Sequence, residues 1–185
     1  MIIKQIFDYF FALILLFILS ILLLFIYVFT SIDTKSNGLF LQKRVGQHGK
    51  LFTIFKFKTM HPKTGKISKL GAFLRKYKID ELPQLFNILI GNMSFVGPRP
   101  DIQGYYDTLE GENRKILELK PGLTSDASIK YANEESLLAK QNNPKQFNDE
   151  ILFPEKVKMN LEYYHNHSFW GDIQIIFKTF LSILK

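Results

Sequence analysis

The longest run of apolar positions lies near the start of the chain, where residues 9–29 carry no charge and Ser20 is the only small polar residue. A helix rises about 1.5 Å per residue, so about 20 helical residues cross the hydrocarbon core of a bilayer. The pattern therefore predicts a membrane-embedded helix within residues 1–31. The remaining residues, 32–185, show no repeat and no low-complexity linker, which indicates one compact domain.

The flanks of this helix bear on its orientation. One lysine and one aspartate precede the apolar run, and no small-residue cleavage site follows it, which favours a retained anchor over a cleaved signal peptide. Basic residues soon after the run indicate that the domain lies on the cytoplasmic face. They are Lys35, Lys43, Arg44 and Lys50. A spanning helix and a re-entrant helix that bends at Ser20 both satisfy this rule, because a serine hydroxyl can bond to a backbone carbonyl and bend a helix.

Beyond the anchor, short apolar runs predict strands over residues 39–42 and 51–58, joined by a hairpin-like loop. Apolar residues at helical spacing then predict several amphipathic helices. They cover residues 69–78, 80–90, most of 101–119, 133–142, 146–163 and 172–184. The core stripe expected for the second of them is Leu82, Leu85, Phe86 and Leu89. The predicted fold class is α+β and mainly helical, with a small β-hairpin and with amphipathic helices suited to a membrane interface.

Composition narrows the chemistry. The chain has no cysteine, which excludes a disulfide framework, thiol catalysis and thiolate metal sites. Its 24 Lys and Arg outnumber its 17 Asp and Glu, and the net charge of +7 suits an anionic substrate or an anionic lipid surface. Nucleic acid is also anionic, but the sequence contains no recognition helix, zinc finger or aromatic RNA platform. His165 and His167 are too few for a metal site, because no third ligand is evident.

The first candidate site is the pair Asp80 and Glu81 at the predicted start of a helix. A structural role is open to both, because Asp is a good N-cap, Glu suits a first turn, and Pro83 is tolerated there. In the functional interpretation, the two carboxylates form a site with neighbouring basic residues. Such a carboxylate could act as a nucleophile or hold Mg²⁺. The neighbouring basic residues are Arg75, Lys76 and Lys78.

The second candidate is a set of cations suited to phosphate. Arg99 lies between Pro98 and Pro100, so its backbone is restrained, and a fixed guanidinium matches the oxygens of a phosphate. The other members are Arg44, Lys56 and Lys58, which lie in or beside the predicted strands and suit an anionic substrate or lipid headgroup. A solvated turn and solvated strand ends remain the alternative interpretation.

Four segments in close succession carry a resemblance. They are residues 56–60 (KFKTM), 79–87 (IDELPQLFN), 91–100 (GNMSFVGPRP) and 120–124 (KPGLT). With these motifs, the chain closely resembles the bacterial sugar transferase family, the small monotopic phosphoglycosyl transferases. The resemblance covers nearly the whole chain.

The resemblance implies an activity. Members of the family move a phospho-sugar from a UDP-sugar to a membrane polyprenol phosphate, such as undecaprenyl phosphate. They release UMP and form a polyprenol diphosphate sugar, the first membrane step of surface glycan assembly. By this resemblance Asp80 is the nucleophile that forms a covalent phospho-sugar intermediate, and Glu81 supports it by positioning or by proton handling. Mg²⁺, held by Asp80, neutralises the diphosphate, and Arg99 contacts a phosphate.

The same resemblance implies a location and partners. The expected location is the bacterial cytoplasmic membrane, with the catalytic domain on the cytoplasmic face. The expected partners are a UDP-sugar, a polyprenol phosphate and membrane lipid, without nucleic acid, and a homodimer is left open. A catalytically silent membrane scaffold for glycan assembly is the alternative function, and the intact Asp80, Glu81 and Arg99 argue against it.

Two departures from the family pattern matter. The family has Ser-Pro in the middle of its N-terminal helix, where the break makes the helix re-entrant, but this chain has Ser20-Ile21. Without proline the helix keeps its backbone bond. We still expect a re-entrant helix that breaks at Ser20. The segment 125–135 also departs from the family pattern, and we expect it to line the sugar or nucleotide end of the site.

Overall fold

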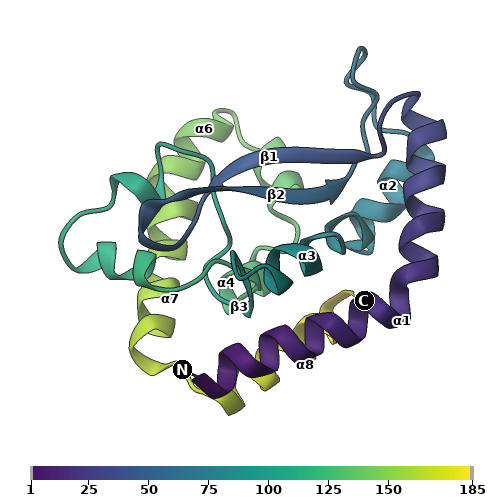
Figure 1. The fold of residues 1–185 in the computed structure, drawn as a ribbon. Coiled ribbons are helices and arrows are strands. Elements are labelled where there is room, and N and C mark those ends of the chain that lie inside the picture. The colour runs from purple at the N-terminus through teal and green to yellow at the C-terminus, as the bar shows by residue number, and fades with distance from the viewer. Residues whose placement is uncertain (1, 184–185) are drawn as a thin grey trace.

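A computed structural model describes residues 2–183 of the chain (Figure 1). Its longest element is the helix α1, Ile2–Thr34. Figure 1 shows that α1 bends sharply part-way along its length, so that a first arm lies beside the C-terminal helix and a second arm rises beside the hairpin. Ser20 Oγ donates to the carbonyl of Phe17 at 2.8 Å, the kind of bond that loosens a helix locally. The predicted anchor is thus one helix with two arms, and it extends three residues beyond the expected boundary.

The predicted hairpin is confirmed. Strand β1, Leu39–Val45, pairs antiparallel with β2, Leu51–Phe57, and the short 3-10 turn η1, Gln47–Gly49, joins them. The pairing places Leu39 opposite Phe57 and Val45 opposite Leu51. A second, unexpected sheet consists of the parallel strands β3, Ser94–Val96, and β4, Gly122–Thr124.

The other elements are mostly helical, so the fold class is α+β and mainly helical, as predicted. The helix expected over residues 80–90 is divided, because Pro83 separates a 3-10 turn from a short α-helix. The segment 101–119 contains two 3-10 helices, and a π-helical turn interrupts the predicted helix 146–163. Residue 184, the predicted end of the last helix, lies outside the described residues. In chain order the elements are α2 Lys69–Lys76, η2 Ile79–Glu81, α3 Gln84–Leu89, η3 Tyr106–Thr108, η4 Gly111–Glu118, α4 Asp126–Lys130, α5 Glu134–Ala139, α6 Pro144–Phe147, η5 Asn148–Leu152, α7 Phe153–Asn166 and α8 Phe169–Ile183.

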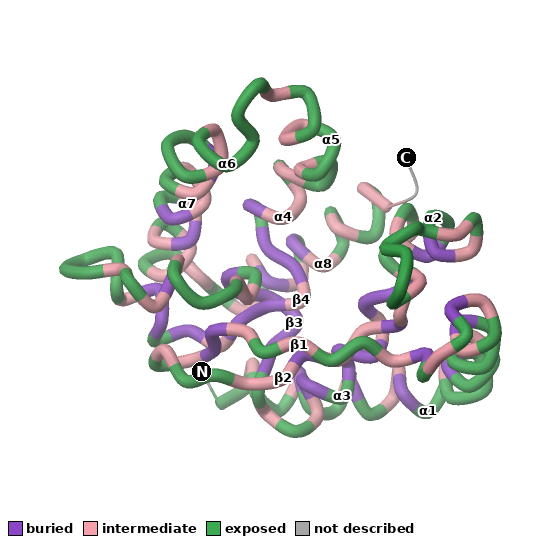
Figure 2. Tube along the Cα trace, turned by 90° about the horizontal axis from the view of Figure 1, so that it is seen from above, coloured by how far each residue is buried: buried purple, intermediate pink, exposed green. Residues whose placement is uncertain are grey.

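The main core lies where α1, the hairpin, α3, β3 and α8 meet. Figure 2 shows buried residues along β3 and β4, whereas α5 and α6 contain none. The prediction that Phe86 belongs to the core was wrong, because Phe86 is 47% exposed. Ile88 is the residue of α3 that is buried in its place. The short helix α3 turns Leu85 and Ile88 inward and leaves Phe86 outside. The buried residues of this core are Ala12, Leu16, Leu23, Ile54, Phe57, Leu85, Ile88, Met93, Phe95, Val96 and Ile175.

Candidate active site

Asp80 and Glu81 lie in the 3-10 turn η2, directly after α2. The chain reverses between the two elements at Lys78, which adopts the left-handed conformation with φ of 56°. The residue that caps η2 is Lys78 and the one that caps α3 is Pro83, so the carboxylate of Asp80 caps neither of them. The capping role that the sequence left open for Asp80 is therefore not the role it has in the fold.

Glu81 is buried and fully engaged by two cations. Arg99 Nη1 donates to Oε2 at 3.1 Å, Arg99 Nη2 donates to Oε1 at 2.5 Å, and Lys56 Nζ donates to Oε1 at 3.0 Å. Burial alone would raise the pKa of Glu81, but the charges and hydrogen bonds of Arg99 and Lys56 outweigh it and hold the pKa well below its usual range. Glu81 is therefore a stable anion that holds the guanidinium group of Arg99 and the ammonium group of Lys56 in place.

Asp80 is in the opposite situation. Its side chain is buried, and its Oδ1 atom has no hydrogen-bond partner among the described residues. Burial, and secondly the charge of Glu81, raise the pKa of Asp80, while Lys56, Lys78 and Arg75 lower it in part. Buried polar atoms in folded proteins are nearly always bonded, so a carboxylate oxygen without a partner near these three cations calls for a functional explanation.

The loop that carries Arg99 is held by the small parallel sheet. Gly97 N donates to Thr124 O at 3.0 Å, and Gly122 N donates to Pro98 O at 2.8 Å. The two glycine backbones approach so closely that a Cβ atom on Gly122 would lie 2.2 Å from Gly97 N. The sheet thereby fixes the start of the loop Pro98-Arg99-Pro100. The guanidinium group of Arg99 contacts Glu81, and 43% of the Arg99 side chain is exposed.

The structure separates the other predicted phosphate-binding residues. Lys56 joins Glu81, and Arg44 lies near Arg99, where its Nη1 donates to Asp101 Oδ1 at 3.4 Å. Lys58, by contrast, follows the end of β2, and its Nζ donates to Ser36 Oγ at 3.0 Å, next to the end of α1. The cluster that contains the Asp-Glu pair therefore includes Lys56 and Arg99, with Arg44 beside it and Lys58 apart.

Sequence reasoning missed the residue that brings the hairpin to this cluster. Asn87 in α3 is fully buried; its Nδ2 donates to Thr53 O at 2.7 Å, and its Oδ1 accepts from Phe55 N at 3.0 Å. These two bonds join α3 to β2 and align Lys56 with Glu81. The available signal was an amide among the apolar residues of a short helix, where an unpaired polar group would be costly.

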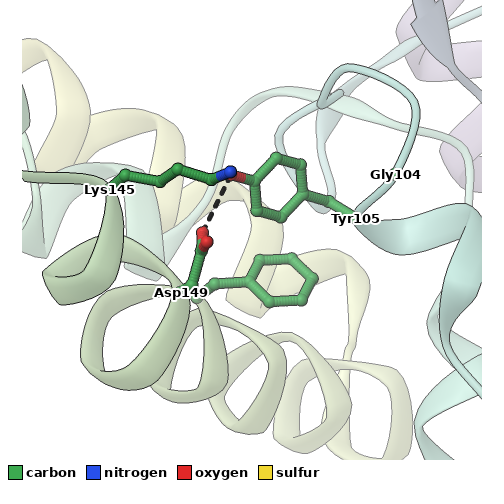
Figure 3. A pocket seen from close by; sticks show the side chains of 5 residues that line it. Gly104, Tyr105, Lys145 and Asp149 are labelled. Atoms are coloured by element: carbon green, nitrogen blue, oxygen red, sulfur yellow. Dashed lines mark hydrogen bonds between the residues drawn. The ribbon is translucent and has the colours of Figure 1, made fainter.

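An open cavity elsewhere on the molecule contains none of the predicted site residues. It has a volume of about 370 Å³ and is lined by Gly104, Tyr105, Lys145, Asp149 and Phe153 (Figure 3). The Tyr105 hydroxyl donates to Asp149 Oδ1 at 2.9 Å, so its main polar pair is already satisfied. The charge cluster around Asp80, and not this cavity, is the better candidate for chemistry.

No group of three His, Asp or Glu side chains that could hold a metal occurs within residues 2–183. His165 Nε2 lies 3.1 Å from Glu112 Oε1, and His167 Nδ1 lies 2.9 Å from Tyr164 O, so the two histidines have separate partners. Mg²⁺ commonly binds through one or two carboxylates together with substrate phosphates. The free Oδ1 of Asp80 fits that donor set, whereas both oxygens of Glu81 are occupied.

Comparison with known proteins places the chain in a class. A family model described as bacterial sugar transferase matches residues 1–185. The chain belongs to the bacterial sugar transferase family.

Similar proteins extend this comparison. The uncharacterized sugar transferase EpsL of Bacillus subtilis is 34% identical over all of this chain and 88% of its own length. The exopolysaccharide production protein PSS of Rhizobium leguminosarum bv. phaseoli is 30% identical over all of this chain and 96% of its own length. The UDP-glucose:undecaprenyl-phosphate glucose-1-phosphate transferase of Escherichia coli is 31% identical over 93% of this chain. The chain spans only 38% of the length of that longer relative.

Proposed function

We propose that the protein transfers a phospho-sugar from a UDP-sugar to undecaprenyl phosphate, with release of UMP and formation of a polyprenol diphosphate sugar. The observation that carries this proposal is the free Oδ1 atom of Asp80, buried beside a glutamate whose own oxygens are bound by two cations. The names of relatives that act on undecaprenyl phosphate support the acceptor. A silent scaffold would have no use for an unsatisfied buried carboxylate, which costs stability.

In the first step, one carboxylate oxygen of Asp80 attacks the phosphorus atom that bears the sugar. The bond from this phosphorus to the bridging oxygen breaks, and UMP leaves with that oxygen and the bonding electrons. The chain then carries the phospho-sugar as an acyl phosphate on Asp80. Arg99 and Lys56, both bonded to the neighbouring Glu81, are close enough to Asp80 to stabilise its charge, and they reduce the repulsion between its carboxylate and the phosphate oxygens.

In the second step, a phosphate oxygen of undecaprenyl phosphate attacks the same phosphorus. The bond to Asp80 breaks, the aspartate leaves as a carboxylate, and the lipid diphosphate sugar forms. Because the phospho-sugar stays covalently bound to Asp80 between the two steps, a soluble donor and a lipid acceptor can use one site in turn. The same cations serve both steps.

Glu81 acts in this scheme as a positioning residue. Its three hydrogen bonds hold the fork of Arg99 and the ammonium of Lys56 in fixed places beside Asp80. An anion that two cations stabilise so strongly is a poor carrier of a proton, since its pKa lies far from the working pH. Of the two roles that the sequence left open for Glu81, we therefore adopt positioning.

Mg²⁺ would be held by the other carboxylate oxygen of Asp80 together with the phosphates of the donor, because both oxygens of Glu81 are already bonded. When bound, the ion would neutralise charge on the diphosphate and favour departure of UMP. The protein supplies the rest through Arg99 and Lys56.

The fixed ends of α1 support a re-entrant anchor. Lys4, in its first turns, donates to Asp172 of α8 and to Val96 O of β3, while Asp33, near its end, accepts from Ser68 Oγ. Both arms are thus bonded to the same domain, whereas a spanning helix would place its first residues across the membrane. On each side of Ser20 the uncharged run 9–29 has about ten residues, or about 15 Å of helix, half the thickness of a bilayer core. Large apolar side chains on α8 are exposed beside the first arm and suit the same interface; they are Trp170, Phe177, Phe180 and Leu181.

The test is turnover with defined substrates. The purified chain in detergent or lipid nanodiscs is incubated with each of a panel of UDP-sugars and with undecaprenyl phosphate, and UMP is measured. We expect repeated UMP release with at least one donor, and only when the lipid acceptor is present. Absence of UMP with every donor, from a chain shown to be folded by circular dichroism, would favour the scaffold instead.

A further inference from the structure

Arg75, in the last turn of α2, is a third fixed cation beside Asp80. Its Nε donates to the buried Thr59 Oγ1 at 2.8 Å, and its positive charge is among those that stabilise the Asp80 carboxylate. The hydrogen bond at Nε fixes the orientation of the guanidinium and leaves its Nη atoms to face outward. A guanidinium held in this way is prepared to bind two oxygens of one phosphate.

The position of Arg75 follows from an unusually close approach of two backbones. A Cβ atom on Gly71 would lie 2.2 Å from Thr59 O, so only glycine allows α2 to pack on residue 59 in this way. Ser68 caps the same helix by accepting from Gly71 N at 2.8 Å. The start of α2 is therefore fixed against the strand end that carries Thr59, and Arg75 lies within reach of it.

Within residues 2–183, the ion-pair partner of Arg75 is Glu135, from the short helix α5. Both carboxylate oxygens of Glu135 lie 3.5 Å from Arg75 Nη1, and the Glu135 side chain is 88% exposed. Helix α5 contains no buried residue, and its contact with α7 is the ion pair of Glu134 with Lys156, on the residue before Glu135. A pair this long and this solvated contributes little to stability.

We propose that Arg75 is a further contact for the diphosphate of the donor, and that the carboxylate of Glu135 occupies this place until the donor binds. The inference rests on the proposed function and concerns the same site. A diphosphate carries more charge than a carboxylate and can engage both Nη atoms, so it displaces Glu135. Because Glu135 is exposed, its carboxylate moves into water without losing other contacts. Glu135 thus weakens donor binding without contacting the reacting atoms.

The test is a double-mutant cycle with inorganic pyrophosphate as the probe, which makes binding independent of turnover. Pyrophosphate is titrated calorimetrically into the full chain in metal-free buffer of low ionic strength. The proteins are the native chain, Arg75→Gln, Glu135→Gln and the double variant. Glu162→Gln is the matched control, because Glu162 is an exposed glutamate of α7 with no ion-pair partner among the described residues. Arg75→Lys, which keeps the charge but not the fork, is a second variant in case Arg75→Gln folds poorly.

We expect Glu135→Gln to tighten pyrophosphate binding about two- to fivefold, the range of an exposed ion pair. Arg75→Gln and Arg75→Lys should weaken it, the former by about fivefold or more. In the Arg75→Gln background, Glu135→Gln should change nothing, and Glu162→Gln should be neutral throughout. Equal effects of Glu135→Gln in both backgrounds, or no pyrophosphate binding by the native chain, would overturn the inference.

A parallel UMP assay separates this inference from the proposed function. The Glu135→Gln variant should have a lower KM for the donor than the native chain, and the same kcat. If the native chain turns over but the binding cycle is additive, only the inference fails. If the cycle behaves as expected in a chain that releases no UMP with any donor, only the proposed function fails.

Discussion

Two clusters of ionisable side chains, each built around two buried carboxylates, differ in how fully those carboxylates are bonded. The active-site cluster contains Lys56, Asp80, Glu81 and Arg99, and the anchor cluster contains Lys4, Asp8, Tyr163 and Asp172. In the anchor cluster both oxygens of Asp172 are engaged, by Lys4 Nζ at 2.5 Å and by the Tyr163 hydroxyl at 2.6 Å. Asp8 Oδ1 also accepts from Phe95 N at 3.3 Å.

The active-site cluster leaves Asp80 Oδ1 unbonded while the neighbouring Glu81 accepts three hydrogen bonds. A fully bonded buried network makes one arrangement of the chain specific, and here it joins the first arm of α1 to α8 and β3. The active-site cluster, in contrast, contains one buried carboxylate oxygen that no side chain within residues 2–183 satisfies. From this difference in bonding we propose a structural role for the anchor cluster and a catalytic role for the active-site cluster.

Of the variants that test the difference between the two clusters, Asp80→Asn should have the largest effect on UMP turnover. The amide is nearly isosteric but cannot form the acyl phosphate, so we expect UMP turnover to fall by at least about a thousandfold. Burial raises the pKa of Asp80, which means that its ionised form destabilises the fold at neutral pH. The thermal midpoint of Asp80→Asn should therefore equal or exceed that of the native chain. Native-like turnover in this variant would remove Asp80 from the reaction.

Asp172→Asn tests the anchor cluster. Removing one partner of a buried ion pair leaves Lys4 without its counter-charge, and such losses cost about 3–5 kcal/mol. We expect a large fall in the free energy of unfolding, measured by chemical denaturation in detergent. Asp126→Asn is a suitable control, because the ion pair of Asp126 with Lys178 is exposed and 3.8 Å long. Equal stability of the two variants would show that the anchor cluster is not structural.

Glu81→Gln should lower turnover by about a hundredfold, because Arg99 and Lys56 lose the anion that holds them. The pKa of Glu81 is depressed in the folded chain, so the stability that its ionised form contributes is present above the unfolded pKa of about 4.3. That contribution is lost as the pH falls through the lower folded pKa. The difference in unfolding free energy between the native chain and Glu81→Gln should thus narrow from pH 6 to pH 3. A constant difference over this range would argue against the ionised pairing.

Arg99→Lys should reduce turnover by about tenfold, a smaller loss because the charge remains while the two-pronged contact is lost. The matched control is Arg114→Lys, since Arg114 is exposed and bonds to backbone carbonyls such as Leu109 O. We expect the control to keep native rates in the UMP assay. If Arg99→Lys also kept native rates, Arg99 would have no role in phosphate binding and would only be part of a turn.

The smallest expected effect is an absence of labelling at the start of α1. The native chain has no cysteine, so Ile2→Cys gives a single thiol. If the anchor cluster holds the first arm to the domain, a membrane-impermeant thiol reagent should not label intact cells, and labelling should appear after permeabilisation. Labelling from outside would establish a spanning helix and contradict the re-entrant topology.

Local signals in the sequence predicted much of the fold. The hairpin and the helix expected over residues 69–78 depend on neighbouring residues, and the structure confirms both. The parallel pairing of β3 with β4 joins two three-residue strands far apart in the chain, which no local pattern reveals. The outward turn of Phe86 depends on how α3 packs after Pro83, and it was missed for the same reason.

The residues of the candidate site likewise divide into those that local motifs predicted and those that depend on distant contacts. The motifs predicted Asp80, Glu81, Lys56 and Arg99, which the structure brings together. They could not separate Lys58 from Lys56, because only the course of the chain past β2 directs Lys58 toward Ser36. The anchor cluster joins Lys4 to Asp172, near the two ends of the chain, and residue spacing alone does not reveal such a contact.

The central claim is that Asp80 carries the phospho-sugar, and the mass of the intact protein tests it most directly. The chain is mixed with its UDP-sugar donor without undecaprenyl phosphate, quenched in acid and weighed, and the modified residue is located by peptide fragmentation. We expect the mass to rise by one phospho-sugar on Asp80, with release of one UMP per chain, and to return to its starting value when the lipid acceptor is added. Asp80→Asn should gain no mass. Turnover of donor and acceptor without any modified chain, or a modification at another residue, would contradict the account.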